Sequence, residues 1–226
     1  MEGDHLSPES RALAQATWWA GERDGHACLI TGVGNSRSAQ AHIIPPFLHG
    51  KDPGRAWQWL ALFWGTQKVQ AWRDLVMRDS VINAHRIYNL LTVGLDVRNY
   101  LDCGLAALRP VSVNEDKTEM RIALHWLPLP REFAEMSRTD MVPLTQNPLE
   151  EPGFRPTMTP GGNHPVYIVS DGGRTWETVR SGHIFTVKTT NVEQRPLPSF
   201  QLLELMWFMT RIARMEGKSN QENGVH

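Results

Sequence analysis

The segment over residues 23–45 constrains the fold of this 226-residue chain more than any other part of the sequence. Its apolar residues predict a short buried strand over 29–31. A polar, glycine-containing turn is predicted over 32–38, and a second strand over 39–44. Two prolines end this second strand, because proline cannot donate a hydrogen bond to a neighbouring strand. A single histidine, His42, therefore lies in a short apolar strand.

Helices and further strands are predicted along the rest of the chain. A serine, a proline and a glutamate over 7–9 are typical of a helix start, and Gly21 is predicted to end that helix. Segment 54–78 has apolar residues at helical spacing and predicts two helices that meet near Gly65. The remaining predicted elements are a short helix over 96–101, antiparallel strands over 106–110 and 120–126, short strands over 166–169 and 183–189 on either side of a turn at 171–173, and a helix over 199–216.

We expect a single domain over 1–226. Its ends, 1–6 and 218–226, are predicted to be flexible tails. Segment 128–165 is rich in proline and glycine, which predicts a long, mostly irregular excursion.

The composition favours a soluble intracellular protein. The formal net charge of −1 gives no global attraction to nucleic acid. Two cysteines do not make a disulfide framework, and they do not form a CxxC pair for structural zinc. No apolar run approaches the roughly 18 residues of a membrane helix. We therefore expect a cytoplasmic location, with the nucleus as an alternative, and no membrane partner, while the oligomeric state stays unknown.

Four sequence patterns, in their order and spacing, resemble one known family. They are RDGHACLITG from Arg23, AHIIP around His42, YNLLTVGLDVRNYLDCG around Asn89, and SGHIFTVKTT followed by PLPS near the end. Together they resemble the His-Asn-His (HNH) endonuclease-like family, in the branch common in fungi. The resemblance covers residues 10–217 and implies an α+β fold: a degenerate ββα-metal core with added helices, an antiparallel hairpin layer and a C-terminal amphipathic helix.

The resemblance also implies roles for individual residues. In the family a divalent metal is held against a phosphate, and His42 would be the general base that Asn89 orients. The last family histidine, which helps to bind the metal, is replaced here by Arg98. A guanidinium stays protonated and has no lone pair for a cation. Many nucleases of the wider family also have an aspartate just before the first histidine, where this chain has Gln40 and Ala41. Other candidate ligands are His85, Asp96 and Asp102.

Three functions follow from these residues. The first is a metal-independent enzyme without a cofactor, which catalyses a cyclisation, rearrangement or pericyclic step on a small-molecule substrate in specialised metabolism. His42 and Arg98 would then act on the substrate, and Asn89 would support them. The second is an active HNH endonuclease with a divalent metal. The third is a non-catalytic nucleic-acid or protein binding module with phosphate contacts from arginines. Further candidates for substrate binding, each of which is more often a core residue, are Trp64, His125, Trp126 and His183.

Overall fold

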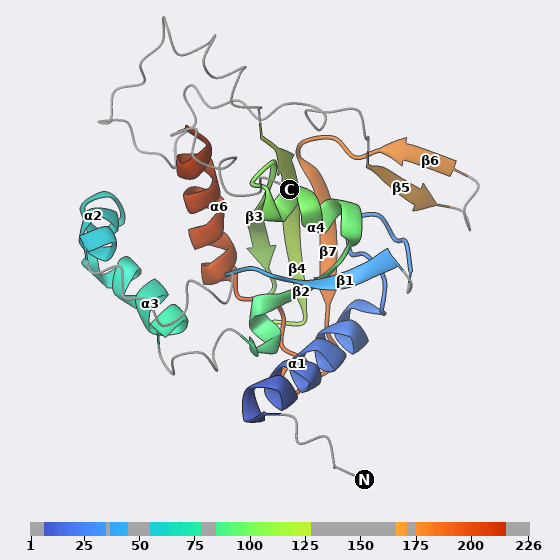
Figure 1. The fold of residues 1–226 in the computed structure, drawn as a ribbon, viewed down its shortest axis with the longest axis horizontal. Helices are drawn as coiled ribbons and strands as arrows, with labels where there is room; N and C mark the ends of the chain where they lie inside the picture. Colours follow the sequence, from blue (N-terminus) through green and yellow to red (C-terminus); the bar gives the residue numbers. More distant parts are fainter. Residues whose placement is uncertain are drawn as a thin grey trace, which may run out of the picture.

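The computed structural model describes residues 7–34, 37–44, 55–77, 85–127, 166–170 and 175–215. These residues form a mixed fold of helices and small antiparallel sheets, as Figure 1 shows, which confirms the expected α+β class. The predicted excursion over 128–165, the predicted tails and the predicted turn at 171–173 lie outside the described residues. The elements are α1 (Pro8–Asp24), β1 (Ser38–His42), α2 (Arg55–Trp64), α3 (Thr66–Met77), the 3-10 turn η4 (Ile87–Asn89), β2 (Leu90–Gly94), α4 (Leu95–Asp102), β3 (Ala106–Val113), β4 (Glu119–Trp126), β5 (Tyr167–Ser170), β6 (Thr175–Thr178), β7 (His183–Lys188) and α6 (Phe200–Met215).

A two-stranded sheet joins segments that lie far apart in the sequence. β1 and β2 pair antiparallel, with Ser38 opposite Gly94 and His42 opposite Leu90. α4 begins at the residue that follows β2. All of β2 except Gly94 is buried, whereas β1 is half-buried apart from the buried Ala41. His42 lies at one end of this strand pair.

The strand predicted over 29–31 is wrong, because these residues form a turn. The Cys28 N–H donates to the Val33 carbonyl at 2.8 Å, and Gly32 adopts a φ of 73°. Glycine accommodates this positive φ, so the chain reverses within a few residues. The turn still touches the strand pair, since the Leu29 N–H donates to the Thr92 carbonyl at 3.0 Å.

The three-stranded sheet has the order β3-β4-β7, and all its strands are antiparallel. The predicted strands over 106–110 and 120–126 are confirmed as β3 and β4. The strands predicted over 166–169 and 183–189 are both present, as β5 and β7, but they do not pair with each other. β7 pairs with β4, and β5 pairs with β6. β6 was missed because it has only four residues, TWET, and no alternating apolar pattern.

Helices cover the two faces of this sheet. On one face, α6 packs against β3, and the rings of His125 and Trp207 lie 5.0 Å apart. On the other, Tyr100 of α4 meets Trp126 edge-on at 5.2 Å. Figure 1 shows α6 beside β3, with α2 and α3 on the far side of α6.

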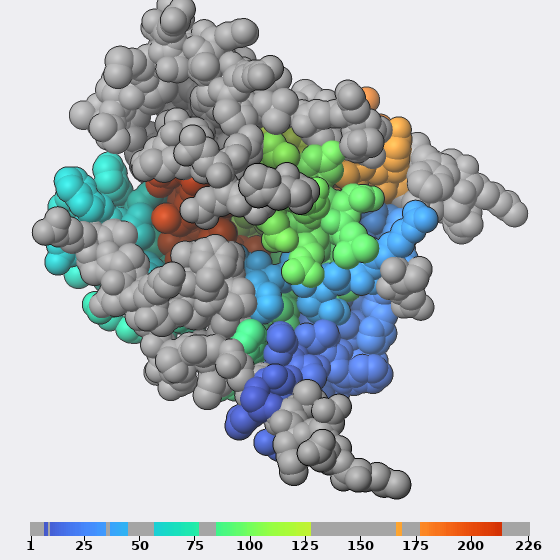
Figure 2. Space-filling model, in the orientation of Figure 1, coloured from blue at the N-terminus to red at the C-terminus, as the bar shows by residue number. Residues whose placement is uncertain are grey.

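α2 and α3 complete the core on the α6 side. They meet at Gly65, whose φ of 80° allows the sharp change of direction, so the predicted break is confirmed. The rings of Trp64 and Trp72 meet edge-on at 5.9 Å, and Trp64 lies 5.0 Å from Phe208 of α6. Figure 2 shows these two helices at the edge of the molecule.

The predicted start of α1 is confirmed, but its predicted end is wrong. Ser7 accepts a hydrogen bond from the Ser10 N–H at 3.1 Å, and Pro8 occupies the first turn. The helix passes through Gly21 and ends at Asp24, with Gly25 as its C-terminal cap. A Cβ at Gly21 would lie 2.7 Å from Nδ1 of His26, so the part-exposed His26 side chain would have to shift. The start of α6 is also confirmed, since the Leu202 N–H donates to Oγ of Ser199 at 3.3 Å.

We expect Gly25→Ala to lower the free energy of unfolding by about 1 kcal/mol, because Gly25 has a φ of 68° that a Cβ disfavours. A Cβ at Gly25 would meet no atom within 4 Å, so the cost is in the backbone alone. Urea denaturation measures it. Gly34→Ala is the matched control, since its Cβ also meets nothing within 4 Å and its φ is not positive. Equal stability of the two variants would contradict the prediction.

Candidate active site

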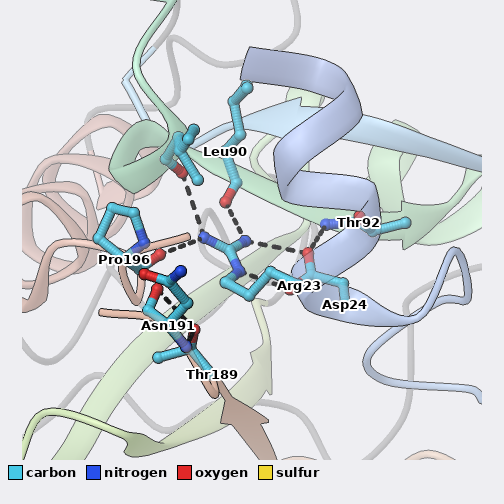
Figure 3. A network of polar contacts seen from close by, with 8 residues as sticks. Arg23, Asp24, Leu90, Thr92, Thr189, Asn191 and Pro196 are labelled. Atoms are coloured by element: carbon cyan, nitrogen blue, oxygen red, sulfur yellow. Dashed lines mark hydrogen bonds and ion pairs between the residues drawn. The ribbon is translucent and has the colours of Figure 1, made fainter. Parts of the chain in front are cut away.

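A buried ion pair at the end of α1 fixes the strand that leads from Asn89. Nε of Arg23 donates to Oδ1 of Asp24 at 2.6 Å, and both side chains are fully buried. The same guanidinium donates to three carbonyl oxygens, those of Ile87 at 3.2 Å, Leu90 at 2.6 Å and Pro196 at 3.0 Å. Figure 3 shows the guanidinium at the centre of these contacts. Arg23 therefore connects α1 with the start of β2 and with the segment before α6.

Asp24 completes this connection. Its Oδ2 accepts hydrogen bonds from Nη2 of Arg23 at 2.9 Å and from the Thr92 N–H at 2.8 Å. A main-chain hydrogen bond adds a contact with the segment before α6, because the Ser199 N–H donates to the Tyr88 carbonyl at 2.8 Å. These contacts hold residues 87–92 from several sides without any contribution from the side chain of Asn89.

Asn89 holds the main chain just after His42. Its carboxamide is fully buried, and Oδ1 accepts from the Ile44 N–H at 2.8 Å. Nδ2 of Asn89 donates to the Ile44 carbonyl at 3.0 Å. The Asn89 carbonyl also accepts from the Ile43 N–H at 2.8 Å. Asn89 therefore acts on His42 through the backbone of the two residues that follow it.

Two imidazoles meet at this end of the strand pair. The rings of His42 and His85 lie 5.6 Å apart at an interplanar angle of 67°. His85 is 7% exposed, and Nε2 of His42 is shielded from solvent. The contact places a second imidazole beside the ring of His42. His85 was predicted from the sequence only as an alternative metal ligand, whereas the structure places its ring beside that of His42.

Arg98 lies on the solvent side of α4. Its Nε contacts Oδ2 of Asp102 at 3.4 Å, one turn later, and the two side chains are 43% and 58% exposed. Val97 is the residue of α4 that is buried. α4 starts from the Gly94 end of β2, opposite the end where His42 lies. The structure thus brings His42, His85 and Asn89 together, whereas Arg98 pairs with Asp102.

Two ligand-type side chains meet at this site within the part of the chain that the structure describes, and Arg98 and Asp102 lie apart from them. Arg98 offers no lone pair, and the carboxylate of Asp102 is held in its exposed pair with Arg98. In the part of the chain that the structure describes, no three or more histidine, cysteine, aspartate or glutamate side chains gather in a way that would hold a metal ion. The imidazoles of His42 and His85 are the ligand-type side chains that meet here.

The four predicted substrate-binding residues are not gathered into one place. Trp126 is fully buried, and its Nε1 donates to the Val179 carbonyl at 2.7 Å. His183 lies on the same face of the sheet as Trp126, because it is opposite Leu124 in register. His125 lies on the other face, against Trp207. Trp64 is 9% exposed and packs in the aromatic cluster with Phe208.

Burial lowers the pKa of His183 below its ordinary value of 6.5, and the nearby Glu177 carboxylate partly offsets this by raising the pKa. The folded state thus binds this proton more weakly than the unfolded state does. We expect His183 to contribute stability that is fully present above pH 6.5 and is lost as the pH falls from 6.5 through the lower pKa of the folded state. NMR titration of its ring protons should give a midpoint below 6.5, and a lower one in Glu177→Gln. An upward shift in that variant would contradict the assignment.

Sequence reasoning missed the roles of Arg23 and Asp24. Both residues stand in the RDG pattern that carries the family resemblance, but the local composition does not indicate that they are buried. A charged pair directly after a predicted helix usually reads as solvated surface. Their position inside a motif was the available signal.

Within the residues described, none of the helices is both long and apolar enough to span a bilayer. A comparison of the chain with protein-family models finds no match, and comparisons with curated proteins and with solved structures find none either.

Proposed function

We propose that β1, β2 and α4 form a core of the His-Asn-His type, and that the chain uses it as a metal-independent enzyme on a small molecule. The observation that carries this proposal is the contact between the half-buried His42 and the buried His85, beside the bonds of Asn89 to Ile44. The order strand, strand, helix supports the core, with Asn89 just before β2 and Arg98 in the helix. The reaction class is a cyclisation, a rearrangement or a pericyclic step.

In this proposal His42 moves the proton. Its neutral imidazole removes a proton from an acidified C–H or O–H of the substrate and becomes an imidazolium. The substrate rearranges, and the imidazolium returns a proton at another position, so no net proton or electron is exchanged. His85 contacts the His42 ring edge-on and limits the orientations that the ring can take. The product is therefore an isomer of the substrate.

Asn89 and Arg98 have supporting roles in this proposal. Asn89 is a positioning residue, since it fixes the backbone at Ile44 rather than touching the His42 ring. Arg98 lies on the solvent side of α4, so it supplies a fixed positive charge to the carboxylate or carbonyl of a substrate that extends from the imidazole pair to that face. Its exposed contact with Asp102, at 3.4 Å, is worth less than about 1 kcal/mol, so a substrate carboxylate can replace it.

The test relies on the fact that an isomerisation leaves the molecular mass of the substrate unchanged. Purified protein is incubated with a fractionated metabolite mixture in the presence of a chelator, and mass spectrometry follows compounds that change retention time at unchanged mass. We expect such a conversion with the natural chain and its loss in His42→Ala. His26→Gln, which changes a histidine after α1, serves as the control and should keep the conversion. A conversion that His42→Ala retains would contradict the role of His42.

A further inference from the structure

Helix α2 carries apolar side chains on two faces. On its inner face, Trp64 packs against Phe208 of α6, with 5.0 Å between the ring centres. On its outer face, Trp59, Leu62 and Phe63 are 63%, 75% and 45% exposed. A helix with apolar residues all round is usually covered on every side. The outer face of α2 therefore has the composition of a contact surface.

These three exposed residues, Trp59, Leu62 and Phe63, form one patch, which we call the α2 patch. Leu62 and Phe63 stand three and four positions after Trp59, and this spacing places all three on the same side of the helix. Figure 2 shows α2 at the outer edge of the molecule. Elsewhere in the described chain, large exposed apolar residues occur singly or in pairs on an element, as Trp18 does in α1 and Leu95 in α4. Scattered residues of this kind are normal, whereas a contiguous patch marks an interaction site.

The charges of the chain favour a second copy as the partner of the α2 patch. Positions 56–64 of α2 contain no charged residue. An anionic membrane or a charged protein therefore meets no complementary charge within the patch. Two copies of this chain repel each other only weakly, because the formal net charge is −1. An apolar and uncharged surface of this kind pairs well with itself.

The exposed area of the α2 patch fits a small interface between two copies. With roughly 200 Å² for each side chain of this size, the exposed fractions amount to roughly 350–400 Å² per copy. A symmetric pair covers this area on both copies and buries roughly 700–800 Å² with these residues alone. The neighbouring Gln58, Leu60 and Ala61, which are exposed or half-buried, extend the contact. They bring the total to about 1,000 Å², the lower limit for a specific interface, which predicts a weak dimer.

We propose that the α2 patch is the interface of a weak symmetric homodimer, in which the α2 helices of two copies pack antiparallel. This arrangement places Trp59 of one copy against Phe63 of the other and the two Leu62 side chains beside the two-fold axis. Each copy offers the same residues, so one helix face supplies both sides of the contact. This surface uses other residues than the imidazole pair, and the dimer does not depend on the enzyme proposed above.

Sedimentation equilibrium of the full chain, at concentrations from about 1 to 200 µM, tests the dimer. We expect the average mass to rise with concentration toward that of two chains, with a Kd of about 1–100 µM. Leu62→Glu and Trp59→Glu place like charges on both sides of the contact and should each weaken association at least about 10-fold. Both residues are exposed in the monomer, so these substitutions leave the fold intact.

Leu95→Glu is the matched control for Leu62→Glu. Leu95 is 54% exposed and lies in the first turn of α4, where a carboxylate is favourable, so this variant should dimerise like the natural chain. Cysteine variants in a Cys103→Ser background test the geometry. Leu62→Cys should oxidise to a disulfide-linked dimer, whereas Leu95→Cys should not, because only cysteines beside the two-fold axis come within bonding range of each other. Cys28 is buried and does not compete.

A natural chain that stays monomeric up to about 200 µM would overturn the dimer. So would association that Leu62→Glu leaves unchanged or that Leu95→Glu weakens equally. A monomer that binds neutral phosphatidylcholine vesicles, and loses this binding in Trp59→Glu, would instead assign the α2 patch to a membrane surface. Failure of Leu62→Cys to form a disulfide-linked dimer would show that the two α2 helices do not meet about a two-fold axis.

Discussion

Arg23→Met is expected to lower the free energy of unfolding by about 3–5 kcal/mol, the largest loss of any single substitution that we predict. The variant loses the guanidinium that donates to the carbonyls of Ile87, Leu90 and Pro196. It also leaves the Asp24 carboxylate buried without its cationic partner. An uncompensated buried charge accounts for most of the loss, because methionine retains much of the buried volume. Urea denaturation measures the change.

Arg11→Met is the control on the same helix. Arg11 is exposed, so this variant should stay within about 0.5 kcal/mol of the natural chain. The double variant Arg23→Met with Asp24→Leu removes both charges and should be less destabilised than the sum of the two single variants. A loss below about 1 kcal/mol in Arg23→Met would show that the network in Figure 3 does not hold the fold together.

Asn89→Ala is expected to lower the free energy of unfolding by about 2–4 kcal/mol, because two hydrogen bonds to Ile44 are lost in a fully buried place. The Ile44 N–H and carbonyl remain buried and lose these partners. Hydrogen exchange gives a local readout: the Ile44 amide should exchange faster in the variant. The Ile43 amide bonds the main-chain carbonyl of Asn89, so it should keep more of its protection.

Asn114→Ala is the matched control for Asn89→Ala. Asn114 also accepts two main-chain hydrogen bonds, from the N–H groups of Thr118 at 2.8 Å and Glu119 at 2.9 Å, but in an exposed turn. Water can replace those bonds, so we expect a loss of about 1 kcal/mol or less. Similar losses of unfolding free energy in the two asparagine variants would contradict the prediction that burial makes the hydrogen bonds of Asn89 more stabilising.

The local parts of the fold could be predicted from the sequence. The cap at Ser7, the break at Gly65 and the cap at Ser199 were predicted because each depends on residues within one or two turns. The hairpin of β3 and β4 was predicted because its strands are long and joined by a polar turn. Such signals need no knowledge of distant contacts.

Long-range contacts explain the predictions that failed. Residues 29–31 have a strand-like composition, but a reversal at Gly32 places them beside β2 as a turn. β7 is a strand as predicted, yet its partner is β4, because Phe185 and Val187 continue the buried face of Ile122 and Met120. Periodicity predicts which face is buried but does not name the neighbouring strand.

The same limit applies to the site. His42 and Asn89 were predicted as site residues because each stands in a motif that resembles a known family, and the structure connects them through Ile44. The contact between His42 and His85 could not be predicted, because no pattern in the sequence relates the two positions.

The most direct test of the account asks whether the chain cleaves nucleic acid with a divalent metal. Purified protein is incubated with supercoiled plasmid and magnesium or manganese, with and without a chelator, and its metal content is measured in parallel. The account predicts no cleavage under any condition, the same result for His42→Ala, and no stoichiometric metal. Cleavage that needs the metal, stops with the chelator and is lost in His42→Ala would contradict it.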